Sequence, residues 1–501
     1  MRSENLKRFF QSEGYFFLLV VLVFSFFTYF HNYQYPSHVF WDENYHIASA
    51  QKYLNGVYFM EQHPPLGKLL IALGEKIIDG NPNDTEFIGT DYATNFREDF
   101  AFAGYRFFPA LLAWLTAPLL YFIFLLLTKR PLWAALLSFF YIFDNALIVH
   151  LRGAMLESTL LFFMSLAIFL FLLIPRVRER KDHLVTASLW FGIALGAVFT
   201  TKLLGLILVL LIPILAWQLK DHRALLRKFA LWAGLGFSVT YVAVWQTHFA
   251  LGKNINPVLP DAGYYQASPA AKQILADRNT QSLLSFPVLW KDAIRFIPHY
   301  NRGTPRLDLC KVDENGSPFF FWPVGARSIN YRWETPNGQA YRYLYLQANP
   351  AVWWTALLGL VVATSLIVSA FLTDAKPFKN PFLLLTFLGL YASYMVAVSR
   401  IDRVMYLYHY FIPLLLSFII FALAFMEIQH IAGFALTEMR KTVGLFCVAG
   451  VIFLGFQFYH PFTYYEPITD KQFEARSIFR LWELRCVNCP KKSMLTVPRA
   501  Q

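Results

Sequence analysis

Two adjacent carboxylates, Asp42 and Glu43, are the residues of this sequence whose type and spacing are best suited to chemistry. They lie in the aromatic segment 40–46, directly after the first long apolar run, and therefore at a membrane boundary. Neighbouring carboxylates repel each other, and a low dielectric raises the pKa of a carboxyl group. Such a pair can supply a general base. A hydrated helix cap at the start of a loop is the structural alternative, and spacing alone does not choose between them.

A second polar motif follows at residues 61–68, Glu-Gln-His-Pro-Pro-Leu-Gly-Lys. Its two prolines fix a rigid turn before an amphipathic helix over 66–78. His63 and Lys68 could meet an anionic headgroup there. Taken alone, however, the motif fits an ordinary turn with solvated side chains better.

Further charged residues stand at the ends of apolar runs, all on the same side of the membrane as the carboxylate pair. Ionisable groups at membrane depth are costly and usually functional, although long side chains also snorkel to the interface. A carboxylate pair with several cations fits a site for a phosphate-bearing substrate. An ion-coupled transporter, which is the non-enzyme alternative, would more often place such charges near the midplane, in interrupted helices. These residues are Arg106, Arg152, Glu157, Lys202, Arg403 and His409.

The composition indicates the setting of these residues. Of 501 residues, 56% are hydrophobic and 15% charged, whereas soluble proteins carry about 25% charged residues. This excludes collagen-like, disordered and small disulfide-rich proteins, and nearly excludes a soluble enzyme. A net charge of +12 could indicate binding to nucleic acid. No basic run, however, resembles a nucleic-acid-binding patch, and we expect no nucleic-acid partner.

The chain is therefore expected to be an all-α polytopic membrane protein with about eleven transmembrane helices and external loops. The fifth and sixth apolar runs are short and are split only by Thr200, Thr201 and Lys202, so a single kinked helix is a rival interpretation there. The runs are 15–30, 106–127, 131–149, 154–174, 185–199, 203–217, 229–249, 351–372, 381–398, 408–427 and 442–459.

Basic residues favour one orientation. With the N-terminus inside, the inner segments carry seventeen Lys and Arg and the short outer loops carry four, as the positive-inside rule requires. Both basic loops that flank 185–217 are then inside, so two helices must lie between them. The first run has no small-residue cleavage pattern after it and is interpreted as an uncleaved helix. The N-terminus is expected to be cytoplasmic and the C-terminus external.

This arrangement divides the chain into four regions. Residues 1–250 form an N-terminal transmembrane catalytic region that includes the external loop 31–105. Residues 251–350 form a large external loop, 351–459 the C-terminal transmembrane helices and 460–501 an external tail. In an oxidising compartment Cys486 and Cys489 of the tail could close a small disulfide, and Cys310 could instead pair with either.

These motifs together resemble the protein O-mannosyltransferase family, whose members are GT-C glycosyltransferases that use a polyprenyl-phosphate mannose donor. One motif would be weak, but seven in order along most of the transmembrane region are specific. Glu157 is a departure, because the family has Asp at that place. The matching segments are 42–43, 63–68, 106–109, 152–158, 202–205, 349–354 and 407–413.

The resemblance implies a bacterial-type member in the plasma membrane, without the β-trefoil insert that eukaryotic members carry in the large outer loop. It implies transfer of mannose to Ser or Thr hydroxyls of an acceptor protein at the external face, with inversion. A related GT-C transferase that glycosylates a lipid or a cell-wall glycan is the alternative.

The resemblance also assigns roles to residues. Asp42 would be the base, and Glu43 would position the acceptor or the donor sugar. Arg106 and Arg403 would contact the donor phosphate. Supporting or substrate-binding residues would be Arg152, Glu157, Lys202, His409 and His63. Asp42, Glu43 and Glu157 could form a carboxylate metal site, but no specific ligand spacing is present, so we expect no metal or other cofactor.

Overall fold

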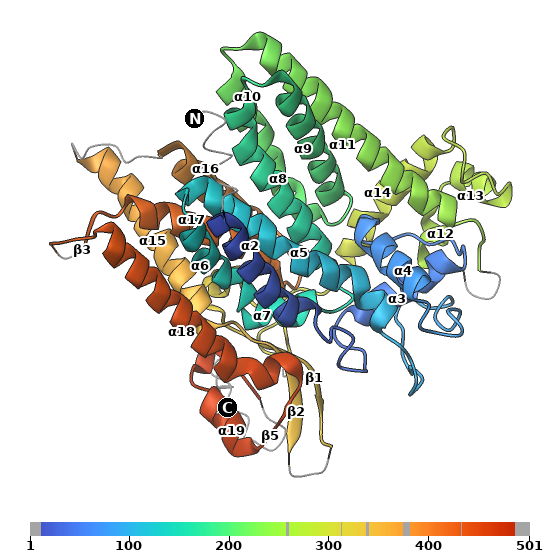
Figure 1. Cartoon of the computed structure of the whole chain (residues 1–501). Helices are drawn as coiled ribbons and strands as arrows, with labels where there is room; N and C mark the ends of the chain where they lie inside the picture. The colour runs from blue at the N-terminus through green and yellow to red at the C-terminus, as the bar shows by residue number, and fades with distance from the viewer. Residues whose placement is uncertain are drawn as a thin grey trace. The chain divides into compact units, whose positions relative to one another are not determined.

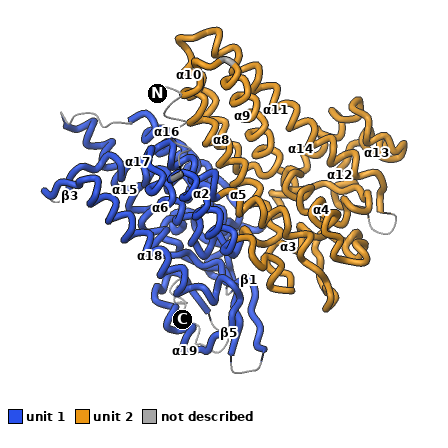
Figure 2. Tube along the Cα trace, viewed as in Figure 1, with its two compact units in different colours: residues 1–28, 117–150, 305–501 blue, residues 29–116, 151–304 orange. Residues whose placement is uncertain are grey.

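The computed structural model describes residues 12–256, 260–311, 313–336, 340–373, 381–431 and 433–485. The fold is predominantly helical (Figure 1). It forms two compact units, each assembled from segments that are distant in the sequence (Figure 2). Unit 1 comprises residues 1–28, 117–150 and 305–501, and unit 2 comprises residues 29–116 and 151–304. Helix α5 (Ala103–Thr128) contributes to both.

Nine helices of the described chain are long and apolar enough to cross a membrane, so the expectation of a multi-pass membrane protein is confirmed. Each matches one of the predicted apolar runs. A tenth run, 131–149, is a pair of helices, α6 (Pro131–Ile142) and α7 (Asn145–Leu151), that meet at 65°. The nine are Glu13–Phe30, α5, α8 (Glu157–Val177), the Asp182–Phe199 part of α9 (Lys181–Phe199), α11 (Arg223–Leu251), α15 (Pro350–Leu372), α16 (Pro381–Val398), Leu407–Glu427 and α18 (Glu438–Tyr464).

The region 185–217 contains two helical segments and not one kinked helix. Helix α9 ends at Phe199, and Lys202 is extended, with φ −155° and ψ 137°. A 3-10 helix, η2 (Leu203–Leu210), and a short helix, α10 (Leu211–Leu219), then continue the chain. Gly205 packs against Val198 of α9, which shows that the chain reverses at the break. Figure 1 shows α10 at the end of the bundle where α9 begins.

The part of unit 2 between the first span and α5 contains two packed helices, α3 (Glu43–Leu54) and α4 (Leu66–Ile78). The bounds of α4 are those predicted for the amphipathic helix. Ile47 of α3 and Ile71 of α4 are fully buried in one core with aromatic residues of the following loop. Gly74 lets α4 approach α5 closely, because a Cβ atom there would lie 2.3 Å from the carbonyl oxygen of Gly104.

Three further helices of unit 2 lie in the predicted large loop. They are α12 (Ala262–Gln266), α13 (Pro269–Ala276) and α14 (Phe286–Arg302). They form a second core with Trp245 and Phe249 at the end of α11.

Unit 1 is centred on α17 (Phe411–Glu427), a helix that is apolar all round and buried along most of its length. Helices α15 and α16 pack on α17, while α18 packs on α6. Helix α2 (Ser12–Ser25) also packs on α6. Helices α15 and α16 are also apolar but much less buried than α17, so the central position of α17 follows from its packing and not from its composition.

A small sheet in unit 1 was not predicted from the sequence. Strands β1 (Ile329–Glu334), β2 (Tyr341–Leu346) and β5 (Pro467–Ile468) are antiparallel in the order β1-β2-β5. The sheet joins the end of the large loop to the tail, and Tyr343 and Tyr345 bury one face against Phe462 of α18 and Phe473 of α19 (Asp470–Arg476). The helical spans therefore agree with the expected fold class, and the sheet is an addition that was not expected.

Smaller elements complete unit 1. They are the 3-10 segments η3 (Phe319–Val324), η4 (Leu407–Tyr410) and η5 (Arg480–Trp482), and a hairpin of β3 (His430–Ile431) and β4 (Phe434–Ala435). Among the described residues Cys310 and Cys447 are free and exposed. The predicted pair Cys486 and Cys489 lies outside the described residues.

Candidate active site

A buried ion pair between Glu43 and Arg106 is the central feature of the candidate site in unit 2. Glu43 is the first residue of α3, and Arg106 lies in the first turn of α5. The Nε and Nη2 atoms of Arg106 donate to the two carboxylate oxygens of Glu43 over 2.6 and 2.8 Å. Both side chains are fully buried. This two-pronged geometry is the strongest way for a guanidinium to hold a carboxylate.

The remaining N–H groups of Arg106 bind backbone. Nη1 donates to the carbonyl oxygens of Gln34 and Pro36 over 2.7 and 2.6 Å, and Nη2 donates to that of His38 over 2.7 Å. The guanidinium also lies 4.9 Å from the ring centre of Phe40. All five N–H groups are therefore used within the protein. In this structure Arg106 fixes the segment that leads into α3, whereas the sequence predicts a contact with the donor phosphate.

Glu43 is occupied in the same way. Besides Arg106, its carboxylate accepts the backbone N–H groups of Phe40, over 3.1 Å, and of Ala154, over 2.8 Å. A fully buried carboxylate with four donors is not available to a sugar. In this structure Glu43 positions the protein backbone, whereas the resemblance implies that it positions the acceptor or the donor sugar.

Gly153 makes this arrangement sterically feasible. A Cβ atom at this position would lie 2.8 Å from the ring of Phe40 and 3.2 Å from Oε1 of Glu43. A side chain would therefore push apart the two segments that Glu43 joins. The sequence gives no signal for this contact, because it depends on a missing side chain and on the backbone N–H of Ala154.

Asp42 lies at the junction that Glu43 and Arg106 hold. It is half-buried and precedes α3, where its carbonyl oxygen accepts the N–H groups of Tyr45 and His46 over 3.1 and 3.3 Å. Its carboxylate makes no helix-capping hydrogen bond. The preceding residue, Trp41, has a φ of 50°, a left-handed conformation that is uncommon for bulky residues. Of the adjacent carboxylates, only Glu43 is enclosed completely.

His46 links α3 to the same loop as Glu43. Its Nδ1 atom lies 2.7 Å from the carbonyl oxygen of Ala154. Burial, and then the ammonium group of Lys68, lower the pKa of His46 to about 3. The imidazole is therefore neutral at physiological pH, with its Nδ1–H donating to Ala154.

The His-Pro-Pro motif is attached to the end of α9 by a hydrogen bond of 2.7 Å from Leu66 N to the carbonyl oxygen of Thr200. Burial, and then the charges of Lys202 and Lys68, hold the pKa of His63 well below its usual range. Lys68 is itself buried, pairs with Glu61 and donates to the hydroxyl of Ser49 over 3.1 Å. Lys68 is thus part of the packing between α3 and α4.

A second, largely buried ion pair joins Lys202, directly before η2, to Glu157, the first residue of α8. Arg152 lies in the loop before α8, where its Nη2 atom donates to the carbonyl oxygens of His31 and Asn32 over 3.1 and 2.6 Å. Unit 2 therefore contains seven of the predicted site residues, namely Asp42, Glu43, His63, Arg106, Arg152, Glu157 and Lys202.

The other two predicted residues, Arg403 and His409, belong to unit 1. Arg403 is half-buried, and its Nε atom lies 3.4 Å from the carbonyl oxygen of Val404. His409 is buried, with Nδ1 close to both backbone N and O of Tyr406, at 3.1 and 3.0 Å, and its ring stacked on Tyr408. These contacts fix the turn that opens α17.

Within the described ranges, no group of three or more His, Cys, Asp or Glu residues is arranged to hold a metal ion. Two of the three carboxylates considered for such a site are engaged elsewhere, Glu43 with Arg106 and Glu157 with Lys202.

Comparison with solved structures identifies the fold class of this chain. The solved protein O-mannosyltransferase Pmt1-Pmt2 complex of S. cerevisiae, bound to the sugar donor, aligns with a TM-score of 0.79 over 95% of this chain and 93% of that chain. Sequence identity in that alignment is 15%, so the likeness concerns the fold. The fold class is that of a membrane-embedded GT-C glycosyltransferase.

Family models match most of the sequence. Residues 19–251 match the model of dolichyl-phosphate-mannose-protein mannosyltransferases, and residues 298–482 match that of the C-terminal four-transmembrane region of protein O-mannosyltransferase. The chain belongs to the protein O-mannosyltransferase family.

Individual relatives agree with this assignment. Dolichyl-phosphate-mannose–protein mannosyltransferase 1 of Candida albicans is 31% identical over 254 residues, which are 49% of this chain and 27% of the relative. Protein O-mannosyltransferase 1 of Drosophila pseudoobscura is 30% identical over 241 residues, 45% of this chain and 26% of the relative. The alignments thus span about a quarter of the length of these curated relatives.

Proposed function

We propose that this chain transfers mannose from a polyprenyl-phosphate mannose donor to Ser or Thr hydroxyls of proteins. Membership of the family supports the reaction class, and the names of the relatives support mannose as the sugar and protein as the acceptor. The observation that carries the proposal for the site is the buried Glu43–Arg106 pair, which fixes the backbone on which Asp42 stands.

In the proposed reaction Asp42 accepts the proton of the acceptor hydroxyl. The hydroxyl oxygen forms a bond to the anomeric carbon of the mannosyl group, and the bond from that carbon to the phosphate oxygen breaks. The electron pair leaves with the polyprenyl phosphate. Attack from the face opposite the leaving group converts a β-linked donor into an α-linked product. A phosphate needs little protonation to leave, so the site requires a base and cations but no general acid.

The structure changes which cationic residues we propose as contacts of the donor phosphate. Arg106 and Glu43 act as positioning residues, since both are fully used within the protein. Arg403 remains the proposed phosphate contact, because a guanidinium binds phosphate through two N–H groups. Supporting roles are proposed for Arg152, Glu157, Lys202, His409 and His63. We propose that the reaction uses no metal or other cofactor.

The proposed site faces the external side of the membrane, with a cytoplasmic N-terminus and an external C-terminus. The excess of basic residues in the proposed inner segments supports this orientation. The donor would present its sugar at that face while its polyprenyl chain lies in the bilayer. We propose a bacterial plasma membrane as the location.

The test is transfer by the purified full chain from labelled polyprenyl-phosphate mannose to a Ser/Thr peptide. The proposal predicts labelled peptide, and no label when Ala replaces every Ser and Thr of the peptide. Label that enters only added lipid or glycan would identify a related transferase with a different acceptor. Absence of any transfer by the folded protein would reject the proposed function.

A further inference from the structure

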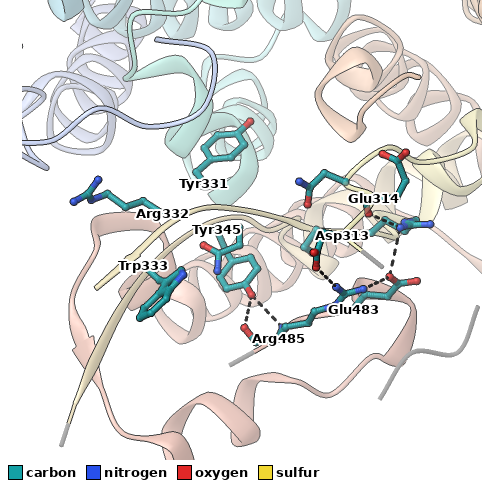
Figure 3. Close-up of a pocket in the computed structure, with 12 residues that line it drawn as sticks. Asp313, Glu314, Tyr331, Arg332, Trp333, Tyr345, Glu483 and Arg485 are labelled. Atoms are coloured by element: carbon teal, nitrogen blue, oxygen red, sulfur yellow. Dashed lines mark hydrogen bonds and ion pairs between the residues drawn. The ribbon is translucent and has the colours of Figure 1, made fainter. Parts of the chain in front are cut away.

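A polar cavity of about 310 Å³ lies within unit 1, beside the sheet (Figure 3). Strand β1 supplies Asn330, Tyr331, Arg332 and Trp333 to its wall, and β2 supplies Tyr345. The rest of the wall comes from two further segments, residues 313–315 with 327–328 of the outer loop and residues Glu483 and Arg485 of the tail. None of these residues belongs to the site described above.

Two buried side chains of this cavity have polar atoms that lack hydrogen-bond partners among the described residues. Arg327 is 5% exposed; its Nη2 atom donates to the carbonyl oxygen of Glu314 over 2.7 Å, but Nε and Nη1 have no partner. The side chain of Glu483 is 8% exposed, and its Oε1 atom likewise has none. Buried polar atoms are usually paired, so a cavity with both donors and acceptors left over indicates a ligand or ordered water.

The charges of the cavity balance. Three arginines, 327, 332 and 485, face three acids, Asp313, Glu314 and Glu483. The ion pairs that Arg485 forms with Glu483 and Asp313 are long, at 3.7 and 3.8 Å (Figure 3). The pair between Arg327 and Glu483 is also 3.7 Å. A phosphate or carboxylate ligand would need an excess of positive charge, so these contacts favour a neutral polar ligand.

An aromatic surface completes the cavity. Trp333 is 49% exposed although it is a large apolar side chain in a strand, and Tyr331 and Tyr345 line the same space. A flat ring with one exposed face packs well against the C–H face of a sugar ring. Sugar hydroxyls both donate and accept hydrogen bonds, which matches the unpaired atoms of Arg327 and Glu483.

We infer that this cavity binds a neutral sugar residue, and specifically an α-mannosyl group already attached to the acceptor polypeptide. The choice of mannose rests on the proposed function, whose product carries that group. Tyr331 ties the cavity to the predicted motif at 407–413, because its hydroxyl lies 2.6 Å from Nδ1 of His150, and His150 stacks on Tyr408. The enzyme would thus hold acceptors that are already mannosylated and favour clustered modification.

The test compares two synthetic peptides that differ only in one α-mannosyl group on a threonine, in calorimetric titrations of the purified full chain without donor. The mannosylated peptide should bind at least about tenfold more tightly, the gain expected from hydrogen bonds to charged groups. Glu483→Gln and Trp333→Ala should each remove that difference. Trp190→Ala provides the matched control, because Trp190 is similarly exposed, at 50%, and lies in α9 of unit 2.

Three outcomes would overturn the inference. The two peptides could bind equally to the wild-type protein, or the difference could persist in both cavity variants with an unchanged melting temperature. Equal weakening of both peptides by the variants would instead identify a site for the polypeptide itself. The titration contains no donor, so a protein that fails the transfer test yet discriminates the peptides would refute the proposed function and leave this inference standing.

Discussion

Arg106 holds Glu43 through two hydrogen bonds of 2.6 and 2.8 Å, at a place where neither side chain is exposed to solvent. Glu43 also receives the N–H group of Ala154, so one carboxylate connects α5, the start of α3 and the loop before α8. The consequence concerns the neighbouring residue, Asp42. The contacts of Glu43 hold the backbone of Asp42 in place, and the Asp42 carboxylate makes no helix-capping hydrogen bond.

Arg106→Lys should destabilise the protein and not merely weaken donor binding. An ammonium group cannot replace the two-pronged contact with Glu43 or reach the three carbonyl oxygens. Each buried acceptor that loses its donor costs about 1–3 kcal/mol. We expect a clearly lower melting temperature in detergent, with donor binding per folded molecule retained. An unchanged melting temperature together with lost donor binding would return Arg106 to the phosphate site.

Gly153→Ala should reduce both stability and transfer activity. Its Cβ atom would lie 2.8 Å from the ring of Phe40, a distance that requires the ring or the loop to move. Overpacking of this kind typically costs about 1–3 kcal/mol. Gly234→Ala is the control, because a Cβ atom there meets nothing within 4 Å in the described structure, and Ala favours a helix. Equal behaviour of the two variants would contradict the packing described around Glu43.

Stability should fall as the pH is lowered from about 6.5, because His46 is held neutral in the folded state. Burial, and then Lys68, lower its folded pKa to about 3, whereas the unfolded chain binds a proton near pH 6.5. This contribution to stability is therefore complete well above pH 6.5 and decreases by about 1.4 kcal/mol for each pH unit between about 6.5 and about 3. His63, whose pKa is lowered in the same direction, adds to this slope.

His46→Asn tests whether His46 causes this loss of stability at low pH. The asparagine amide N–H can still donate to the carbonyl oxygen of Ala154 but does not titrate. Chemical unfolding of both proteins at pH 7 and pH 5 should give a smaller loss of stability for the variant. A loss equal to that of the wild type would show that His46 does not carry the acid sensitivity.

Arg403→Lys should lose transfer activity although the positive charge is kept. A guanidinium holds phosphate through two N–H groups, whereas an ammonium is a point charge. Because Arg403 is only half-buried, the fold should tolerate the change. Steady-state transfer and donor binding provide the measurement. Wild-type values for the lysine variant would remove Arg403 from the site.

The membrane spans could be predicted from the sequence because each depends on local composition. Apolar runs and the break at Thr200–Lys202 are visible in a short window, and so is the amphipathic pattern of α4. The sheet was not predictable in this way. Strand β1 pairs with β2 and β2 with Pro467–Ile468 of the tail, so the pairing depends on contacts between distant segments.

The types of site residues could also be predicted, but not all of their roles. Asp42, Glu43 and Arg106 were identified as charged residues at a membrane boundary. The structure shows that Glu43 and Arg106 are fully buried, whereas Asp42 is half-buried. Which carboxylate is enclosed depends on the backbone N–H of Ala154 and the space left by Gly153. Backbone amides carry no residue-type signal, so the pairing that distinguishes Glu43 from Asp42 became visible only in three dimensions.

The central claim, that Asp42 is the base, is tested most directly by the single-turnover rate of Asp42→Asn. The amide keeps the shape of the side chain and removes the negative charge. Loss of a general base should slow the chemical step by about 10²–10⁴-fold, while donor binding and the melting temperature stay close to wild type because the Glu43–Arg106 pair is intact. A folded Asp42→Asn protein with a near-normal single-turnover rate would contradict the account.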